Sequence, residues 1–188
     1  MLEKLSHLRK NLFKPFLVKI NPGYVSIISL LLALVASYFL FTSSWLLAAI
    51  FLLVSGFLDA LDGEIARKFK LETKFGDFLD HSLDRIADAA FFIALAFNPE
   101  IPTVLALLTL AAILLVSYLG TEAQALTGKR LYTALVGRAD RLVILIVAVF
   151  AQIFYSNSIL YALYFILILS AITFLQRFYL TSRQLKGT

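Results

Sequence analysis

Long apolar runs separated by short polar breaks dominate the chain. A membrane-spanning helix needs about 20 mostly apolar residues. The pattern predicts six such helices, at about 22–41, 45–66, 76–97, 101–126, 139–155 and 159–180. The breaks at 42–44, 98–102 and 156–158 are rich in Ser, Thr, Asn and Pro, which is typical of tight turns. We therefore expect an all-α polytopic membrane protein, with one six-helix domain over residues 21–188.

The composition supports a membrane environment. Hydrophobic residues make up 61% of the 188 positions, whereas soluble domains contain about 45–50% apolar residues. A soluble chain of this length could not bury so much apolar surface in one core. The sequence has no cysteine, which excludes disulfides and thiolate metal sites. In a membrane protein the positions of the basic residues matter more than the net charge of +5. No nucleic-acid partner is expected.

Lysine and arginine are distributed asymmetrically between the two ends of the predicted helices. They precede the first span, follow the second, separate the fourth from the fifth and follow the sixth, whereas the three turns at the other ends have none. Cytoplasmic loops of membrane proteins carry the excess of positive charge. The distribution predicts an integral cell-membrane protein with both termini on the cytoplasmic side.

Residues 1–20 differ from the rest because basic and apolar positions alternate. Five apolar positions have spacings that can share one helical face, namely Leu5, Leu8, Leu12, Phe13 and Phe16. Such a segment is typical of an interfacial amphipathic helix on an anionic leaflet. The alternative is a plain juxtamembrane tail.

Four acidic residues lie where a membrane helix normally avoids charge. Asp59 and Asp62 belong to the second predicted span, and Asp80 and Asp84 belong to the third. A charge at mid-membrane costs at least ~2.5 kcal/mol, and clustered carboxylates also repel one another. The same two helices contain only one basic residue away from their ends, Arg85. The deficit of positive charge indicates bound metal ions.

The spacing of these acids supports one shared site. Asp59 and Asp62 are three residues apart and Asp80 and Asp84 are four apart, so each pair shares a helix face. If the two helices pack together, four carboxylates converge. Carboxylate oxygens suit Mg²⁺ or Mn²⁺, and the lack of cysteine and scarcity of histidine argue against zinc. Arg67, near the cytoplasmic end of its helix, is suited to bind a phosphate.

The residues around the acids form a motif. They read Asp59-Ala-Leu-Asp62-Gly63-Glu-Ile-Ala66-Arg67, eight residues, then Gly76-Asp-Phe-Leu-Asp80-His-Ser-Leu-Asp84. Every fixed position resembles the signature of the CDP-alcohol phosphotransferase family, D-x2-D-G-x2-A-R-x8-G-x3-D-x3-D. The resemblance also covers the length, the six spans and their orientation. It implies a phospholipid-biosynthesis enzyme that moves a phosphatidyl or archaetidyl group from a CDP-alcohol lipid to a small alcohol and releases CMP.

The resemblance also implies residue roles. Two divalent metal ions would be held by Asp59, Asp62, Asp80 and Asp84, with Asp84 also the general base. The CDP group would be contacted by Gly63, Ala66, Arg67 and Ser26. A phosphorylated acceptor would meet Arg138, Arg141 and Arg177. The acceptor stays open between glycerol phosphate, inositol phosphate and related alcohols, because Tyr118 is followed by Leu-Gly-Thr-Glu and not by the Lys and Arg of inositol-phosphate users. A homodimer and a cytoplasmic active site are implied as well.

Simpler interpretations compete with several of these roles. Intramembrane carboxylates also mark ion or proton transporters, but the acids occur at one end and no repeat is visible. A membrane scaffold would not need four convergent acids. Other polar residues have bland alternatives in helix capping, ion pairing, interhelical hydrogen bonding or the positive-inside rule: Asp77, His81, Asp88, Glu122, Gln124 and Arg138.

Overall fold

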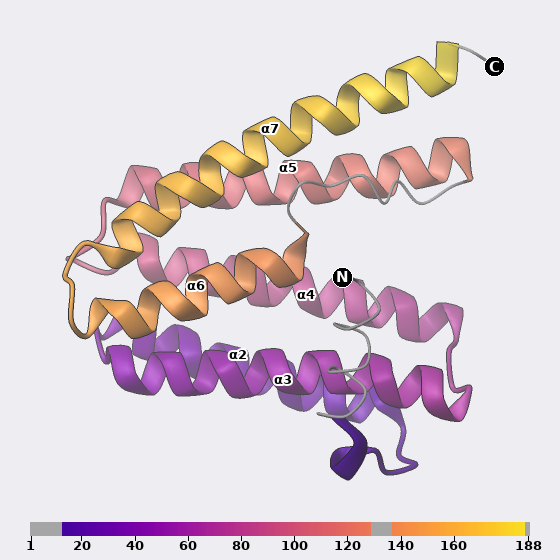
Figure 1. Ribbon diagram of the computed structural model, residues 1–188, viewed down its shortest axis with the longest axis horizontal. Coiled ribbons are helices and arrows are strands. Elements are labelled where there is room, and N and C mark those ends of the chain that lie inside the picture. The colour runs from indigo at the N-terminus through magenta and orange to yellow at the C-terminus, as the bar shows by residue number, and fades with distance from the viewer. Residues whose placement is uncertain (1–12, 129–136, 187–188) are drawn as a thin grey trace.

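The computed structural model describes residues 13–128 and 137–186, and these form a bundle of six long helices (Figure 1). A 3₁₀ turn, η1 (Lys14–Phe16), precedes the bundle. The helices are α2 (Pro22–Phe41), α3 (Trp45–Phe69), α4 (Lys74–Ala96), α5 (Thr103–Thr127), α6 (Arg138–Gln152) and α7 (Ser158–Lys186). The predicted all-helical fold with six long helices is confirmed.

Only some of these helices have the length and composition of membrane spans. α2, α3, α5 and α7 are long and apolar enough to cross a bilayer. α4 is 23 residues long but carries the acidic residues, and α6 has 15 residues. A helix rises 1.5 Å per residue, so α6 is about 22 Å long, against about 30 Å of hydrocarbon. The chain is an integral membrane protein, and six complete crossings stay a prediction.

Local sequence sets where the helices begin. The side chain of Asn21 accepts a hydrogen bond from the amide of Gly23 at 3.0 Å, and Pro22 takes the first helical position of α2. Thr73 caps α4 in the same manner, accepting from the amide of Gly76 at 2.9 Å. Such caps satisfy amides that have no partner within the helix. They fix the start of α2, which carries Ser26, and the start of α4, which carries Asp80 and Asp84.

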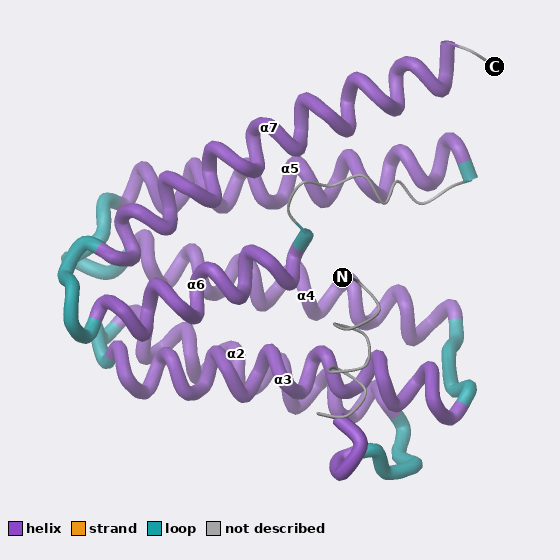
Figure 2. The backbone as a smooth tube through the Cα atoms, in the orientation of Figure 1, coloured by secondary structure: helices purple, strands orange, loops and turns teal. Residues whose placement is uncertain are grey.

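The helices pack in a ring in which each one contacts two neighbours. α2 contacts α3 and α4, α5 contacts α4 and α7, and α6 contacts α3 and α7. The loops α2–α3, α4–α5 and α6–α7 lie together at one end, which we call the turn end (Figure 2). The α3–α4 loop lies at the opposite end, which we call the site end.

Two buried amides close the turn end. Asn98 donates to the carbonyl of Leu40 at 2.7 Å and to Ser43 Oγ at 3.0 Å, and its own Oδ1 accepts from the amide of Glu100 at 2.8 Å. Gln152 accepts from the amide of Ile159 at 3.0 Å and donates to the carbonyl of Ser156. These bonds satisfy backbone groups at helix ends that have no partner within their own helix.

The start of the described chain packs against α3. Phe13 is 4% exposed, and its ring lies 5.1 Å from that of Phe57. Phe16 meets the same ring edge-on at 5.3 Å. The predicted amphipathic helix falls mostly on residues 1–12, outside the described residues. Its last two apolar positions therefore contact the bundle itself, which anchors this segment beside α3.

Candidate active site

The four predicted metal-binding aspartates converge in the space between α3 and α4, which both pack on α2. One oxygen from each of Asp59, Asp62 and Asp80 lies within 4.8 Å of the other two. A second group with the same spacing consists of Asp80, His81 and Asp84. Asp62 and Asp84 are 4% and 7% exposed. The spacings of three and four residues therefore bring the carboxylates together as the sequence predicted, because each pair lies on one face of its helix and that face is turned toward the other pair.

Hydroxyl groups of α2 fix its position against α3. Ser26 donates to Asp62 Oδ2 at 2.6 Å and to the carbonyl of Pro22 at 3.2 Å. One turn further, Ser29 and Ser55 each donate to the other's carbonyl, at 2.9 and 3.0 Å. Reciprocal bonds of this kind allow only one register between two helices. They hold the Ser26 hydroxyl directly against the acidic cluster.

Arg138 reaches the acids from the start of α6. Its Nη1 lies 2.7 Å from Asp59 Oδ2, to which it donates, and 2.7 Å from Asp84 Oδ1. The contact with Asp84 is an ion pair without hydrogen-bond alignment. α6 can approach α3 this closely because Gly56 has no side chain; a Cβ there would lie 2.8 Å from Leu142 Cδ2. The positive charge of Arg138 thus offsets part of the repulsion among the aspartates.

The donor set and the space between the acids fit a hard divalent cation. A polar void of about 10 Å³ is bounded by Ser26, Asp59, Asp80, Asp84 and Arg138, among others. That volume is about the size of one water molecule or small ion. Oxygen ligands with several negative charges suit Mg²⁺ and Mn²⁺. Arg138 contributes a single positive charge to four carboxylates, so substantial negative charge is left for a cation.

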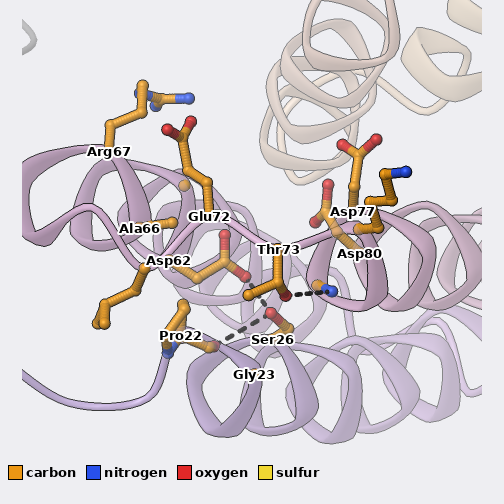
Figure 3. A pocket seen from close by; sticks show the side chains of 14 residues that line it. Pro22, Gly23, Ser26, Asp62, Ala66, Arg67, Glu72, Thr73, Asp77 and Asp80 are labelled. Carbon is orange, nitrogen blue, oxygen red and sulfur yellow. Dashed lines mark hydrogen bonds between the residues drawn. The ribbon is translucent and has the colours of Figure 1, made fainter.

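An open cavity of about 400 Å³ lies next to the acids, between α2, α3 and the α3–α4 loop. Figure 3 shows Ser26 and Asp62 facing each other at its base, with Arg67 and Glu72 standing away from them at the mouth. Arg67 pairs with Glu64 at 3.3 Å and is half exposed. The wall beside Arg67 is formed by Gly63 and Ala66. The cavity has the cation and the small residues that a nucleotide phosphate requires.

A second cavity, of about 460 Å³, lies between α4 and α5. Its wall on α4 includes His81, which lies 3.8 Å from Asp77, and the guanidinium of Arg85. Its wall on α5 consists of hydroxyl-bearing and apolar residues, namely Leu114, Ser117, Tyr118 and Thr121. Lys74 and Asp77 also line the cavity. A space lined by hydroxyls, with a lysine and an arginine besides the one aspartate, suits a small polyol with an anionic group.

Arg141 and Arg177 lie away from the four aspartates. Arg141 is 7% exposed, and its Nη2 lies 4.0 Å from Asp88 Oδ2. Arg177 donates to the carbonyl of Val116 at 2.8 Å. Both retain a buried Nε with no hydrogen-bond partner in the described part of the chain. Arg141 and Arg85 both approach Asp88 Oδ2, at 4.0 and 3.4 Å, so their guanidinium groups lie close together. Buried donors normally have partners, so this cluster of guanidinium groups is prepared for an anion.

The structure thus separates the predicted residues into groups. The aspartates, Ser26 and Arg138 come together; Gly63, Ala66 and Arg67 line the first cavity; Arg141 and Arg177 lie apart from both. Sequence reasoning placed Arg138 with the acceptor, whereas its contacts here are with Asp59 and Asp84. It missed Glu72 and Thr73, which line the first cavity from a loop without periodicity, and the hydroxyls of the second cavity, which resemble ordinary helix residues.

Comparisons with known proteins found a matching family model, similar chains and similar folds. The family model described as CDP-alcohol phosphatidyltransferase matches residues 19–175. The archaetidylinositol phosphate synthase of Pyrococcus horikoshii is 35% identical over 167 residues, covering 89% of this chain and 86% of that protein. The phosphatidylinositol phosphate synthase of Mycobacterium tuberculosis, solved with CDP-DAG bound, has a TM-score of 0.78 at 23% identity and covers 93% and 94% of the two chains. Its complex with manganese and citrate gives 0.79 at 24% identity, covering 92% and 88%.

Proposed function

The chain belongs to the CDP-alcohol phosphatidyltransferase family, and we propose that it transfers the phosphate-linked lipid of a CDP-alcohol to inositol phosphate, releasing CMP. One observation carries the proposal. Asp62 and Asp80 of the aspartate cluster line a cavity with the features of a nucleotide site, and α4, which carries Asp80 and Asp84, also forms one wall of a cavity lined by hydroxyls and Arg85. A transferase for two such substrates needs them on either side of its reacting groups.

The first cavity is proposed to bind the CDP group. Arg67 at the mouth would pair with a phosphate, and Gly63 would let that phosphate approach the α3 backbone. A Cβ at Gly63 would lie 3.3 Å from Arg67 Nη2, so a larger residue there would crowd the guanidinium. Ser26, hydrogen-bonded to Asp62, would hold that carboxylate in its bonding orientation. The lipid tail would extend into the bilayer along the apolar helices.

The aspartates are proposed to hold two divalent ions, Mg²⁺ or Mn²⁺, through Asp59, Asp62, Asp80 and Asp84. Such ions, when bound, neutralise phosphate charge and acidify a neighbouring hydroxyl. Asp84 is proposed to take the proton from the acceptor hydroxyl as that oxygen bonds to the β-phosphorus. The bond from the β-phosphorus to the bridging oxygen breaks, and that oxygen leaves with CMP. Asp84 is buried, which keeps bulk water from competing for its proton.

The second cavity and the buried guanidinium groups are proposed to bind inositol phosphate. Arg85 and Arg141, which both approach Asp88 Oδ2, would meet the phosphate together with Arg177, whose Nε is buried without a partner among the described residues. Hydroxyls on α5, from Ser117, Tyr118 and Thr121, would hydrogen-bond a polyol ring. Both named relatives are inositol phosphate lipid synthases, which favours this acceptor over glycerol phosphate. The fourth-helix Lys and Arg of other inositol-phosphate users would be replaced here by hydroxyls and Arg85.

The test is a substrate panel with purified enzyme in lipid nanodiscs. CDP-diacylglycerol and its ether-lipid counterpart are each offered with inositol phosphate, glycerol phosphate, inositol or no acceptor, and CMP is measured with and without Mg²⁺. We expect CMP release to require both Mg²⁺ and inositol phosphate. Release with glycerol phosphate alone would transfer the proposal to that acceptor. Ion flux in liposomes without CMP release would support the transporter interpretation instead.

The remaining expectations about location and assembly are also proposals. Basic residues lie at the ends of α3 and α7 and precede α6, which supports a cytoplasmic site end and six crossings. A short α6 can be accommodated by local thinning of the bilayer. The homodimer implied by the family resemblance stays a prediction. Reaction of single introduced cysteines with a membrane-impermeant reagent, at 72 and at 156, would determine the orientation.

A further inference from the structure

An unusually close approach joins α5 and α7 at the site end. Gly120 on α5 lies under the side chain of Arg177 on α7, and a Cβ built at Gly120 would lie 2.5 Å from Arg177 Nη1 and 3.4 Å from its Cζ. Real Cβ atoms essentially never come closer than 3.0 Å to another heavy atom. The guanidinium can therefore occupy this position only because residue 120 is a glycine.

The missing side chain also exposes a backbone acceptor. In a helix, the Cβ of each residue tilts toward the preceding turn, where it covers the carbonyl four residues earlier. At Gly120 that carbonyl belongs to Val116, and it accepts from Arg177 Nη1 at 2.8 Å. A carbonyl oxygen has two lone pairs, so it can bond the helix amide and the guanidinium together. Glycine thus provides both the space for Arg177 and its tether.

The tether holds Arg177 against the same stretch of α5 that forms one wall of the second cavity. Ser117 and Thr121 line that cavity, and each is the next residue along α5 from Val116 and Gly120. The charge of Arg85, which also lines the cavity, acts on Arg177. Arg177 Nη1 is occupied by the tether, while its buried Nε has no partner among the residues that the structure describes. The side chain is held, yet it keeps donors available for an anion.

We infer that Gly120 is a positioning residue for the acceptor, which seats Arg177 so that its guanidinium receives the acceptor's phosphate. The inference rests on the proposed function and adds a determinant of specificity to it. Gly120 touches no substrate and acts only through Arg177. An alanine there would displace the end of a flexible side chain and not the backbone, so the helices would keep their packing while the guanidinium would move.

The experiment compares Gly120→Ala with the wild-type enzyme under Mg²⁺, with CDP-lipid and inositol phosphate varied in turn. We expect the KM for inositol phosphate to rise about tenfold, the size of one lost charged hydrogen bond. The KM for CDP-lipid and kcat at saturating acceptor should stay within about twofold. The Tm should be unchanged or higher, because alanine favours a helix over glycine. A lower Tm with both KM values raised together would indicate a structural role and overturn the inference.

Arg177→Gln supplies the matched control through a double-mutant cycle. Arg177→Gln alone should raise the acceptor KM at least as much as Gly120→Ala does, and adding Gly120→Ala to it should cause no further rise. Additive effects, or an unchanged acceptor KM in Gly120→Ala, would overturn the inference while wild-type turnover with inositol phosphate still supports the proposed function. Absence of wild-type turnover with any phosphorylated acceptor would overturn both.

Discussion

The two ends of the bundle treat buried polar groups differently. At the turn end, Asn98 and Gln152 are uncharged, and both atoms of each amide are hydrogen-bonded to neighbouring backbone or side-chain groups. At the site end, carboxylates crowd together, and Arg141 and Arg177 retain buried donors without partners among the described residues. A satisfied polar group stabilises the fold, whereas an unsatisfied one costs free energy unless a ligand completes it.

This difference predicts opposite consequences for substitutions at the two ends. Changes at the site end should reduce activity and leave stability unchanged or improved, because they relieve like-charge repulsion. Changes at the turn end should reduce stability and leave the substrate KM values unchanged. Each substitution below tests that division, and a variant with the opposite pair of effects would contradict it.

The largest effect is expected for Asp84→Asn. An amide cannot take the acceptor's proton, and general-base catalysis contributes about 10²–10⁴-fold, so transfer should fall by about 10³-fold or more. CDP-lipid binding, measured by equilibrium dialysis, should be largely retained, and the Tm should not decrease. Asp88→Asn on the same helix is the comparison, since Asp88 lies outside both acidic groups and contacts Arg85, Arg138 and Arg141, so it should change the KM for the acceptor more than kcat. Normal turnover by Asp84→Asn would remove the general-base assignment.

The next effect is a loss of stability from Asn98→Ala. The substitution leaves the carbonyl of Leu40 and the amide of Glu100 without their side-chain partner, and buried unsatisfied groups cost about 1–3 kcal/mol. We expect a Tm several degrees lower in detergent, with both KM values unchanged below the transition. Asn98→Asp is a useful comparison, because it keeps the acceptor for Glu100 but loses the donor. Raised KM values at an unchanged Tm would mean that the turn end takes part in the reaction.

A smaller effect separates the two cavities within the site end. Arg67→Gln should raise the KM for CDP-lipid about tenfold, because Arg67 lines the first cavity, and should spare the acceptor. Arg141→Gln should raise the KM for the phosphorylated acceptor by a similar factor and spare CDP-lipid. Each loses a charge-assisted bond to a phosphate. Equal effects of both variants on both substrates would show that the two cavities bind a single ligand.

The sequence predicted the parts of the site that local spacing controls. Apolar runs predicted the helices to within a few residues, except that α7 continues six residues beyond its predicted end. Intervals of three and four residues placed Asp59, Asp62, Asp80 and Asp84 on facing surfaces. The contact of Arg138 with Asp59 could not be predicted, because 79 residues separate them and only the close packing at Gly56 brings α6 there.

The acceptor side was harder to predict because its residues look ordinary in sequence. Ser117 and Thr121 donate to carbonyls of their own helix, as many serines and threonines in membrane helices do. Nothing in their spacing distinguishes a cavity wall from a helix interior. The Gly120–Arg177 approach is also invisible, since it depends on how α5 and α7 pack.

The smallest effect is expected for Ser26→Ala, which tests how strongly the site end depends on orientation. The hydroxyl donates to Asp62 Oδ2 at 2.6 Å, and losing a bond worth about 1 kcal/mol should lower kcat/KM about fivefold. Ser37→Ala is the matched control, because Ser37 is a buried serine on the same helix that donates to the carbonyl of Ala33 at 2.9 Å and touches no acid. Titration with Mn²⁺ should show weaker metal binding in Ser26→Ala than in Ser37→Ala, since an untethered carboxylate must be ordered by the ion itself. Equal Mn²⁺ affinities in the two variants would mean that α3 alone orients Asp62, and that the contact with α2 serves packing at the site end as it does elsewhere in the bundle.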